Sequence, residues 1–165
     1  MDAPKEIDAA TLTEALLEYA FSPAGPEVQR ERSYRYLEEL LFLKLFSVDY
    51  VLGIRGASQA EFTPVRMLYN EGIERSSSVK GFDYRTIVAR FETYTVAVNA
   101  YLDYEPEERE RKGRFWDIGK AFSRLASDTE PWVPNALDVA IHGNIFASQC
   151  VRLKDFLDQY ELDVH

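Results

Sequence analysis

The stretch that decides the fold is YRYLEELLFLKLFSVDYVLGI, which covers residues 34 to 54. Apolar side chains in its first half recur every three or four residues, the spacing that places them on one face of an α-helix. These are Tyr34, Leu37, Leu41 and Leu45. The second half is apolar nearly all round, which indicates burial on several sides. The sequence therefore predicts that this helix lies at the centre of the fold.

Two charged residues, Lys44 and Asp49, interrupt the longest apolar stretch of the chain, residues 40 to 54. That stretch is shorter than the roughly 20 residues that a membrane-spanning helix requires, so no membrane span is expected. The spacing of Lys44 and Asp49 does not stack them on one face of the helix. We therefore expect each of them to find a partner on another helix.

Prolines, glycines and capping residues divide the chain into about six helices. We expect these helices over residues 12–21, 26–52, 64–74, 84–104, 106–125 and 136–160. The predicted N-caps are Thr11, Thr63, Asp83 and Asn135. Gly53 is expected to end the second helix, and residues 76–81 are expected to form an exposed loop.

The arrangement of these segments predicts the fold class. No segment alternates with the two-residue period of a strand between hairpin turns. Helices joined by short connections pack as bundles or arrays, so we expect an all-α, single-domain bundle or orthogonal array of about six helices. The long second, fourth and sixth helices are expected to supply most of the core. The domain is expected to cover residues 1–165, with a flexible N-terminus over residues 1–10.

The composition narrows the classes of function and the compartment. The chain carries a net charge of −9 and has an isoelectric point near 4.8. Nucleic-acid binding is not expected, because phosphate contacts need a basic face, whereas a protein with a basic surface is a suitable partner. Cys150 is the only cysteine, which fits a reducing compartment. The acidic start of the chain lacks the basic region of a signal peptide, so we expect a cytoplasmic protein.

Asp138 and His142 are the candidates for a chemical site. They are four residues apart on the last predicted helix, so a carboxylate and an imidazole can face the same way. Such a pair binds a metal when further ligands join it, or acts as a base. The alternative interpretation is a surface pair or a hydrogen-bonded histidine, and the sequence favours it. Cys150 is interpreted as a buried structural thiol, and no phosphate-binding loop or nucleophile motif occurs.

Aromatic and basic residues are the candidates for a partner surface. Aromatic residues make up 13% of the chain, and exposed aromatics dominate binding hot spots. Trp132 lies in a loop between prolines. Short basic clusters occur on the second and fifth predicted helices, and tyrosines accompany the one on the second helix. Because glutamates alternate with these basic residues, solvated helix pairs are the competing interpretation. The selected residues are Trp132, Trp116, Tyr34, Arg35, Arg111 and Arg114.

These patterns together predict a non-enzymatic helical module for protein–protein interaction. A regulator, an inhibitor or immunity-type factor and an assembly subunit are the roles in view. The partner is another protein, including a second copy of this chain in a homodimer, and no cofactor is expected. The alternative is a bundle that binds a small molecule or a metal and acts as an enzyme. Its site would lie near Asp138 and His142, with Tyr101 supplying a further polar group.

Overall fold

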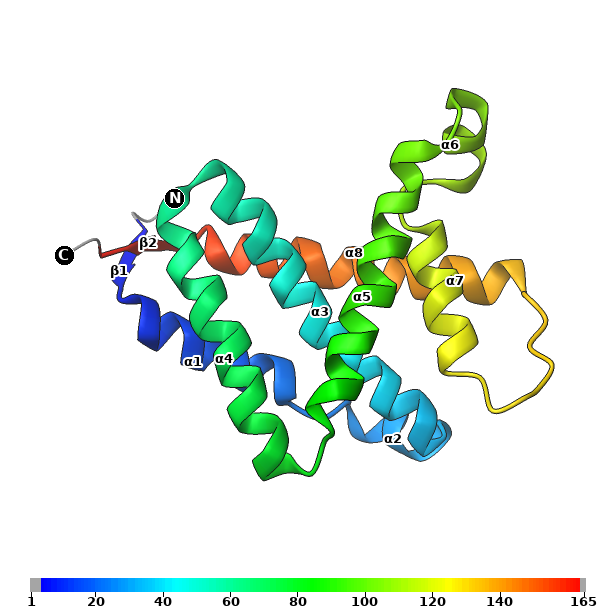
Figure 1. The fold of residues 1–165 in the computed structure, drawn as a ribbon, viewed down its shortest axis with the longest axis horizontal. Helices are drawn as coiled ribbons and strands as arrows, with labels where there is room; N and C mark the ends of the chain where they lie inside the picture. The colour runs from blue at the N-terminus through cyan, green and yellow to red at the C-terminus, as the bar shows by residue number, and fades with distance from the viewer. Residues whose placement is uncertain (1–3, 164–165) are drawn as a thin grey trace.

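The computed structural model describes residues 4–163, and these form an almost entirely helical protein (Figure 1). The all-α prediction is therefore confirmed. The longer helices are α1 (Ala9–Phe21), α3 (Tyr34–Ser58), α4 (Thr63–Lys80), α5 (Tyr84–Asn99), α7 (Trp116–Leu125) and α8 (Ala136–Leu157). The shorter elements are α2 (Pro26–Glu31), α6 (Pro106–Lys112) and the 3-10 helices η1 (Ala60–Phe62) and η2 (Ala100–Asp103).

Helix α3 lies at the centre of the fold, as its sequence predicts. It packs against α1, α4, α5, α7 and α8. Its buried side chains contribute to two apolar clusters, one shared with α1, α4 and the end of α8, the other with α5, α7 and the middle of α8. An apolar run without a polar face is therefore explained by burial on several sides.

The predicted second helix differs from the observed helices at both ends. It is broken at Ser33, whose Oγ accepts a hydrogen bond from the backbone nitrogen of Tyr36 and caps α3. It also continues past Gly53 to Ser58. The guanidinium of Arg66 lies against Gly53, only 3.0 Å from where a β-carbon would stand. Gly53 therefore makes room for a side chain of α4 instead of ending the helix.

Two other boundaries are corrected in the same way. Helix α4 runs through the predicted loop and ends at Gly81, where φ is +79°. Ser77 is buried, and its hydroxyl donates to the carbonyl of Glu74 within the helix. The predicted fifth helix is split into α6 and α7 at Gly113, where φ is +74°. Both glycines adopt the left-handed backbone that other residues disfavour.

The predicted caps are confirmed for two helices and corrected for two. Thr63 is the first residue of α4, whose N-cap position is Phe62 and has no side-chain capping hydrogen bond. Asp83 and Asn135 accept hydrogen bonds from the first-turn nitrogens of α5 and α8. Helix α1 is capped by Asp8, which accepts from the backbone nitrogen of Thr11 at 2.9 Å. Thr11 is therefore inside the helix. With 18 residues, α4 also exceeds the 16 residues of α5, so the long helices are α3, α4 and α8.

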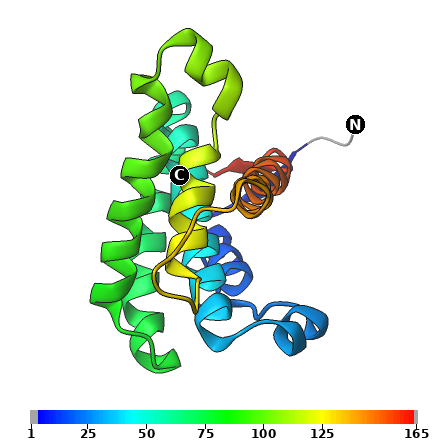
Figure 2. The same cartoon turned by 90° about the vertical axis from the view of Figure 1, so that its right-hand side faces the viewer.

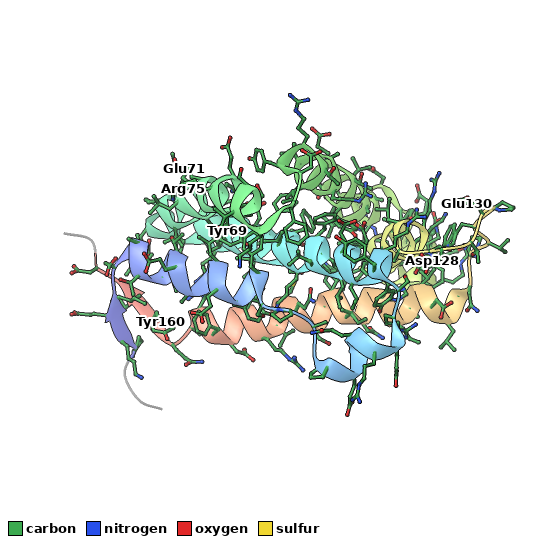
Figure 3. The ribbon with its side chains drawn as sticks, turned by 90° about the horizontal axis from the view of Figure 1, so that it is seen from below. Tyr69, Glu71, Arg75, Asp128, Glu130 and Tyr160 are labelled. Carbon is green, nitrogen blue, oxygen red and sulfur yellow. The ribbon has the colours of Figure 1, made fainter. Side chains whose placement is uncertain are left out.

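Two short strands lie at the ends of the described chain. β1 (Lys5–Ile7) pairs with β2 (Tyr160–Leu162) in parallel, with Lys5 opposite Tyr160 and Ile7 opposite Leu162. Residues 5–7 therefore have a defined structure within the segment expected to be flexible, and residues 1–3 lie outside the described range. Figure 3 places Tyr160 at one end of the molecule and Asp128 and Glu130, in the loop before α8, at the other.

Lys44 and Asp49 find partners outside their own helix, as predicted. The carboxylate of Asp49 accepts two hydrogen bonds from the Arg66 guanidinium at 2.8 Å each and one from Asn70 at 2.9 Å. The ammonium of Lys44 donates to the hydroxyl of Ser22 at 2.6 Å, which follows the end of α1. The two charges of α3 are therefore directed to different sides of the fold.

Candidate partner-binding groove

A groove runs along one face of α8, and we call it the α8 groove. It consists of two adjoining cavities of about 930 Å³ and about 520 Å³ that share Tyr19, Ser22 and Arg152 in their walls. The larger cavity lies between α3, α8 and the segment from Phe21 to Gln29. Figure 2 shows α2, in blue, standing away from α8, in orange, on the same side of the molecule. The smaller cavity lies between α1 and α8, which are seen together in Figure 3.

The periodicity of α8 explains how this helix supplies one wall. Its residues in the two cavities recur at spacings of three or four, which gives a continuous face on an α-helix. They include Ile141, Ile145, Ser148, Arg152 and Phe156. The core residues Val139 and Phe146 are buried and line neither cavity. Helix α8 therefore presents one face to the core and another to the groove.

Exposed apolar side chains gather in the larger cavity. Val28 of α2, Tyr34 of α3 and Ile141 of α8 are 37%, 75% and 46% exposed, respectively, and all three line it. Exposed apolar residues scattered singly are ordinary on a protein surface, whereas a contiguous set marks an interaction site. Three different helices thus place apolar surface in one groove.

A cation lies at the junction of the two cavities. The Lys44 ammonium sits 4.4 Å from the centre of the Tyr19 ring and donates to Ser22. Partial burial lowers the pKa of Lys44. Within residues 4–163, no carboxylate lies within 4.0 Å of it, in contrast to the ion-paired Arg66 and Arg90. The side chain of Arg152 also lines both cavities.

His142 lies in a smaller pocket of about 250 Å³, next to the loop that precedes α8, and this pocket shares Tyr36 and Ile141 with the larger cavity of the groove. Its Nδ1 is 2.7 Å from the hydroxyl of Ser123, and its Nε2 is 3.4 Å from the hydroxyl of Tyr36. The ring also packs on Phe122, with 4.5 Å between ring centres. Burial lowers the pKa of His142, and the nearby Asp138 carboxylate opposes this shift.

The surroundings of His142 favour a structural role. Ser123 is only 7% exposed, and its hydroxyl also lies 2.8 Å from the carbonyl of Gly119. A nucleophile must be reachable by its substrate, and this hydroxyl is covered. In the part of the chain that the structure describes, no group of three or more His, Cys, Asp or Glu side chains is placed to hold a metal ion. Asp138 and His142 therefore gain no third ligand there.

The residues selected for partner binding are divided among separate places. Tyr34 lines the α8 groove, whereas Trp132 lines the His142 pocket with Asp138. Trp116 and Arg114 line a third cavity of about 180 Å³ beside the first turn of α7. Of the selected residues, only Tyr34 therefore lies in the groove, and the two tryptophans line different cavities.

The remaining selected residues have local contacts. The Arg35 Nε donates to the carbonyl of Leu125 at 2.8 Å, which ties the start of α3 to the end of α7. Arg111 is exposed on α6. Tyr101 lies in η2 beneath the guanidinium of Arg109, at 5.5 Å, and does not line the His142 pocket. Cys150 is largely buried, and burial raises the pKa of its thiol to about 12, as expected for a structural cysteine.

Sequence reasoning missed most of the groove. Val28, Ile141 and Arg152 were not selected, and Lys44 was recognised only as a charge that needs a partner. The second apolar stripe of α8 was the available signal, because Ile141, Ile145 and Phe156 follow helical spacing. Their exposure depends on where α1 and α2 lie, which one helix does not reveal.

Comparison with known proteins gives no relative from which the role of the site could be inferred. No family model, curated protein or solved structure matches the chain. None of the helices within residues 4–163 is both long enough and apolar enough to cross a membrane.

Proposed function

We propose that this chain is a non-enzymatic interaction protein that binds another protein through the α8 groove. One observation carries the proposal: Val28, Tyr34 and Ile141 come from three helices and expose apolar surface in the same groove. Exposed tyrosines are typical anchors for a partner, and contiguous apolar surface beside them marks an interaction site. A regulator, inhibitor or assembly subunit in the cytoplasm is the role that fits such a surface.

The alternative of a small-molecule site near His142 is less well supported. Its pocket of about 250 Å³ lies below the roughly 300–1,000 Å³ of ordinary ligand sites. The histidine there is held by hydrogen bonds to two hydroxyls of the protein. The groove is larger and more apolar, and it is the better candidate for recognition.

Site-specific photocrosslinking in cells of the native host tests the proposal. A benzoylphenylalanine in place of Ile141 is expected to yield a discrete protein adduct. The same group in place of Val79 is the matched control, because Val79 is also apolar, is 88% exposed and lies on α4, outside the groove. Adding Tyr34→Lys to the Ile141 variant should reduce the adduct severalfold.

Three other outcomes of the crosslinking experiment would each have a different meaning. Adducts of equal yield from positions 141 and 79 would show that the groove is not selective. The absence of any protein adduct at 141 would overturn the proposed function. An adduct with a second copy of the chain would identify the homodimer as the form in which the groove is used.

A further inference from the structure

The α8 groove has apolar side chains in both of its cavities and polar side chains where the cavities meet. Its two ends are apolar: Tyr34 and Ile141 lie in the larger cavity, and Leu16 and Phe156 lie in the smaller one. Between them lies the junction formed by Tyr19, Ser22 and Arg152. Apolar side chains thus lie in both cavities, and the residues that the two cavities share are largely polar.

The middle of this channel is cationic. Lys44 contacts both Tyr19 and Ser22 at the junction. Arg152 is exposed and makes no hydrogen bond or ion pair of its own with the residues described. Each cavity is also lined by one acid, Glu38 in the larger and Glu18 in the smaller, and neither lies within 4.0 Å of the Lys44 ammonium or forms an ion pair with Arg152. A ligand that fits the groove therefore needs a negative group near its middle.

The length and the walls of the groove indicate the shape of its occupant. Ile141 and Phe156 are fifteen residues apart on α8, which corresponds to about 22 Å along a helix axis. Apart from short loops, among them residues 22–25, the walls are helices whose backbone groups are bonded internally, and none of the lining residues belongs to a strand. The groove therefore offers no strand edge to an extended peptide. A helix of about four turns fits the length and needs only side-chain contacts.

We propose that the occupant is an amphipathic helix of a partner protein, with an acidic residue in the middle of its apolar face. Its carboxylate contacts Lys44 and Arg152, and its apolar residues on either side contact the two ends of the groove. This inference rests on the proposed function and adds the chemistry of the partner.

The net charge of −9 does not decide against an acidic ligand. At physiological ionic strength the Debye length is about 8 Å, so exposed charges farther away are largely screened. The half-buried Lys44 is screened less than those surface charges. The cations at the junction are therefore opposed mainly by Glu18 and Glu38, which line the groove, and little by the acids outside it.

Fluorescence anisotropy with the full chain and labelled 16-residue peptides tests the inference. The probe has leucines at helical spacing, with Glu at the central position of the apolar face. Matched peptides carry Gln or Lys at that position, and a scrambled peptide keeps the composition without the stripe. The Glu peptide is expected to bind about ten-fold more tightly than the Gln peptide, because charge-assisted hydrogen bonds are the stronger ones.

Two variants of the protein locate the source of that preference. Lys44→Met should remove most of the Glu-over-Gln preference, and Arg152→Gln should reduce it. Arg152 is exposed, so its variant remains informative if Lys44→Met fails to fold. Equal binding of the Glu and Gln peptides, or a preference that survives both substitutions, would overturn the inference.

Other occupants give different results in the same experiments. Binding of dodecanoate that depends on Lys44, without binding of any peptide, would replace the helix by a lipid. A dimer in light scattering that Ile141→Lys dissociates would replace it by a second copy of the chain. A protein adduct at position 141 without any preference for the acidic peptide leaves the proposed function intact and rejects this inference alone.

Discussion

The two sides of α3 differ in how they treat charged groups. On the side of α4 and α5, the carboxylates of Asp49 and Glu39 are buried and paired with Arg66 and Arg90. On the side of the α8 groove, the ammonium of Lys44 has two contacts with Ser22 and no carboxylate among the residues described. The buried charges on one side of the helix have oppositely charged partners within the chain, whereas Lys44 on the other side has none among the residues described.

This difference assigns the two sets of charges to different roles, one in stability and the other in binding. Buried charges strongly destabilise a fold when one partner is removed, because the remaining charge is left without compensation. Placing a half-buried charge in a groove costs free energy of desolvation. A ligand that supplies the opposite charge offsets this cost when it binds. The paired side is therefore expected to respond to mutation in stability, and the groove side in binding.

Removing the partner of Glu39 should have the largest effect on stability. Glu39 is 3% exposed and accepts a 2.8 Å hydrogen bond from Arg90. Arg90→Met is expected to lower the free energy of unfolding by about 3 kcal/mol, because it leaves a buried carboxylate uncompensated. Urea unfolding measures this loss. Arg85→Met on the same helix is the matched control, since Arg85 is exposed. Equal losses in the two variants would contradict the comparison.

The second partner of Glu39 should have a smaller effect. The hydroxyl of the buried Tyr94 donates to its other carboxylate oxygen at 2.5 Å. Tyr94→Phe is expected to cost about 2 kcal/mol, the scale of a hydrogen bond to a charged group. Because both partners act on one carboxylate, the double variant with Arg90→Met should deviate from additivity. Strict additivity in urea unfolding would show that the three groups do not act as one network.

The groove side should respond in the opposite direction. Lys44→Met removes a half-buried cation and keeps its aliphatic volume. The free energy of unfolding is therefore expected to stay unchanged or to rise by up to about 1 kcal/mol, since apolar replacements of buried ionic groups are often neutral or stabilising. Thermal unfolding of the free protein measures it. A loss above about 2 kcal/mol would mean that Lys44 is as structural as Arg90.

The smallest effect concerns His142, which is half-buried against Tyr36 of α3. Burial lowers its folded-state pKa below the unfolded value of 6.5, and Arg32 acts in the same direction while Asp138 opposes it. As the pH falls through 6.5, the unfolded state takes up more protons than the folded state, so stability decreases. The variant His142→Gln should lose less stability than the wild type between pH 7 and pH 5. Parallel pH profiles would argue against this assignment.

The sequence predicts the elements better than their junctions. The three-to-four spacing of apolar residues identified the central helix, and Asp83 and Asn135 marked true helix starts. The prediction that Gly53 ends the second helix was wrong, because the role of this glycine depends on Arg66, which approaches from another helix. Ser33 and Gly113 break helices just before the apolar stripes that begin at Tyr34 and Phe115, and the charged residues ahead of these stripes are compatible with one continuous helix or with two. A local pattern carries no information about such tertiary contacts.

The groove was less predictable than the fold for the same reason. Tyr34 was selected for its aromatic character, and Lys44 was recognised as a misfit in an apolar run. That these residues share a groove with Ile141 depends on how α2 and α8 are placed around α3. The direction of a helix after Gly25 or Ser33 is a property of packing, and periodicity alone does not give it.

The pairing of β1 with β2 has a mechanical consequence. Both strands lie at the same end of the molecule (Figure 1) and run parallel. The nitrogen of Lys5 donates to the carbonyl of Gln159, and the nitrogen of Asp163 donates to the carbonyl of Ile7. A force that separates the two ends of the chain enters β1 at its start and β2 at its finish. It therefore shears the strands and loads their hydrogen bonds together, so this short ladder acts as a clamp that must yield before tension reaches the helices.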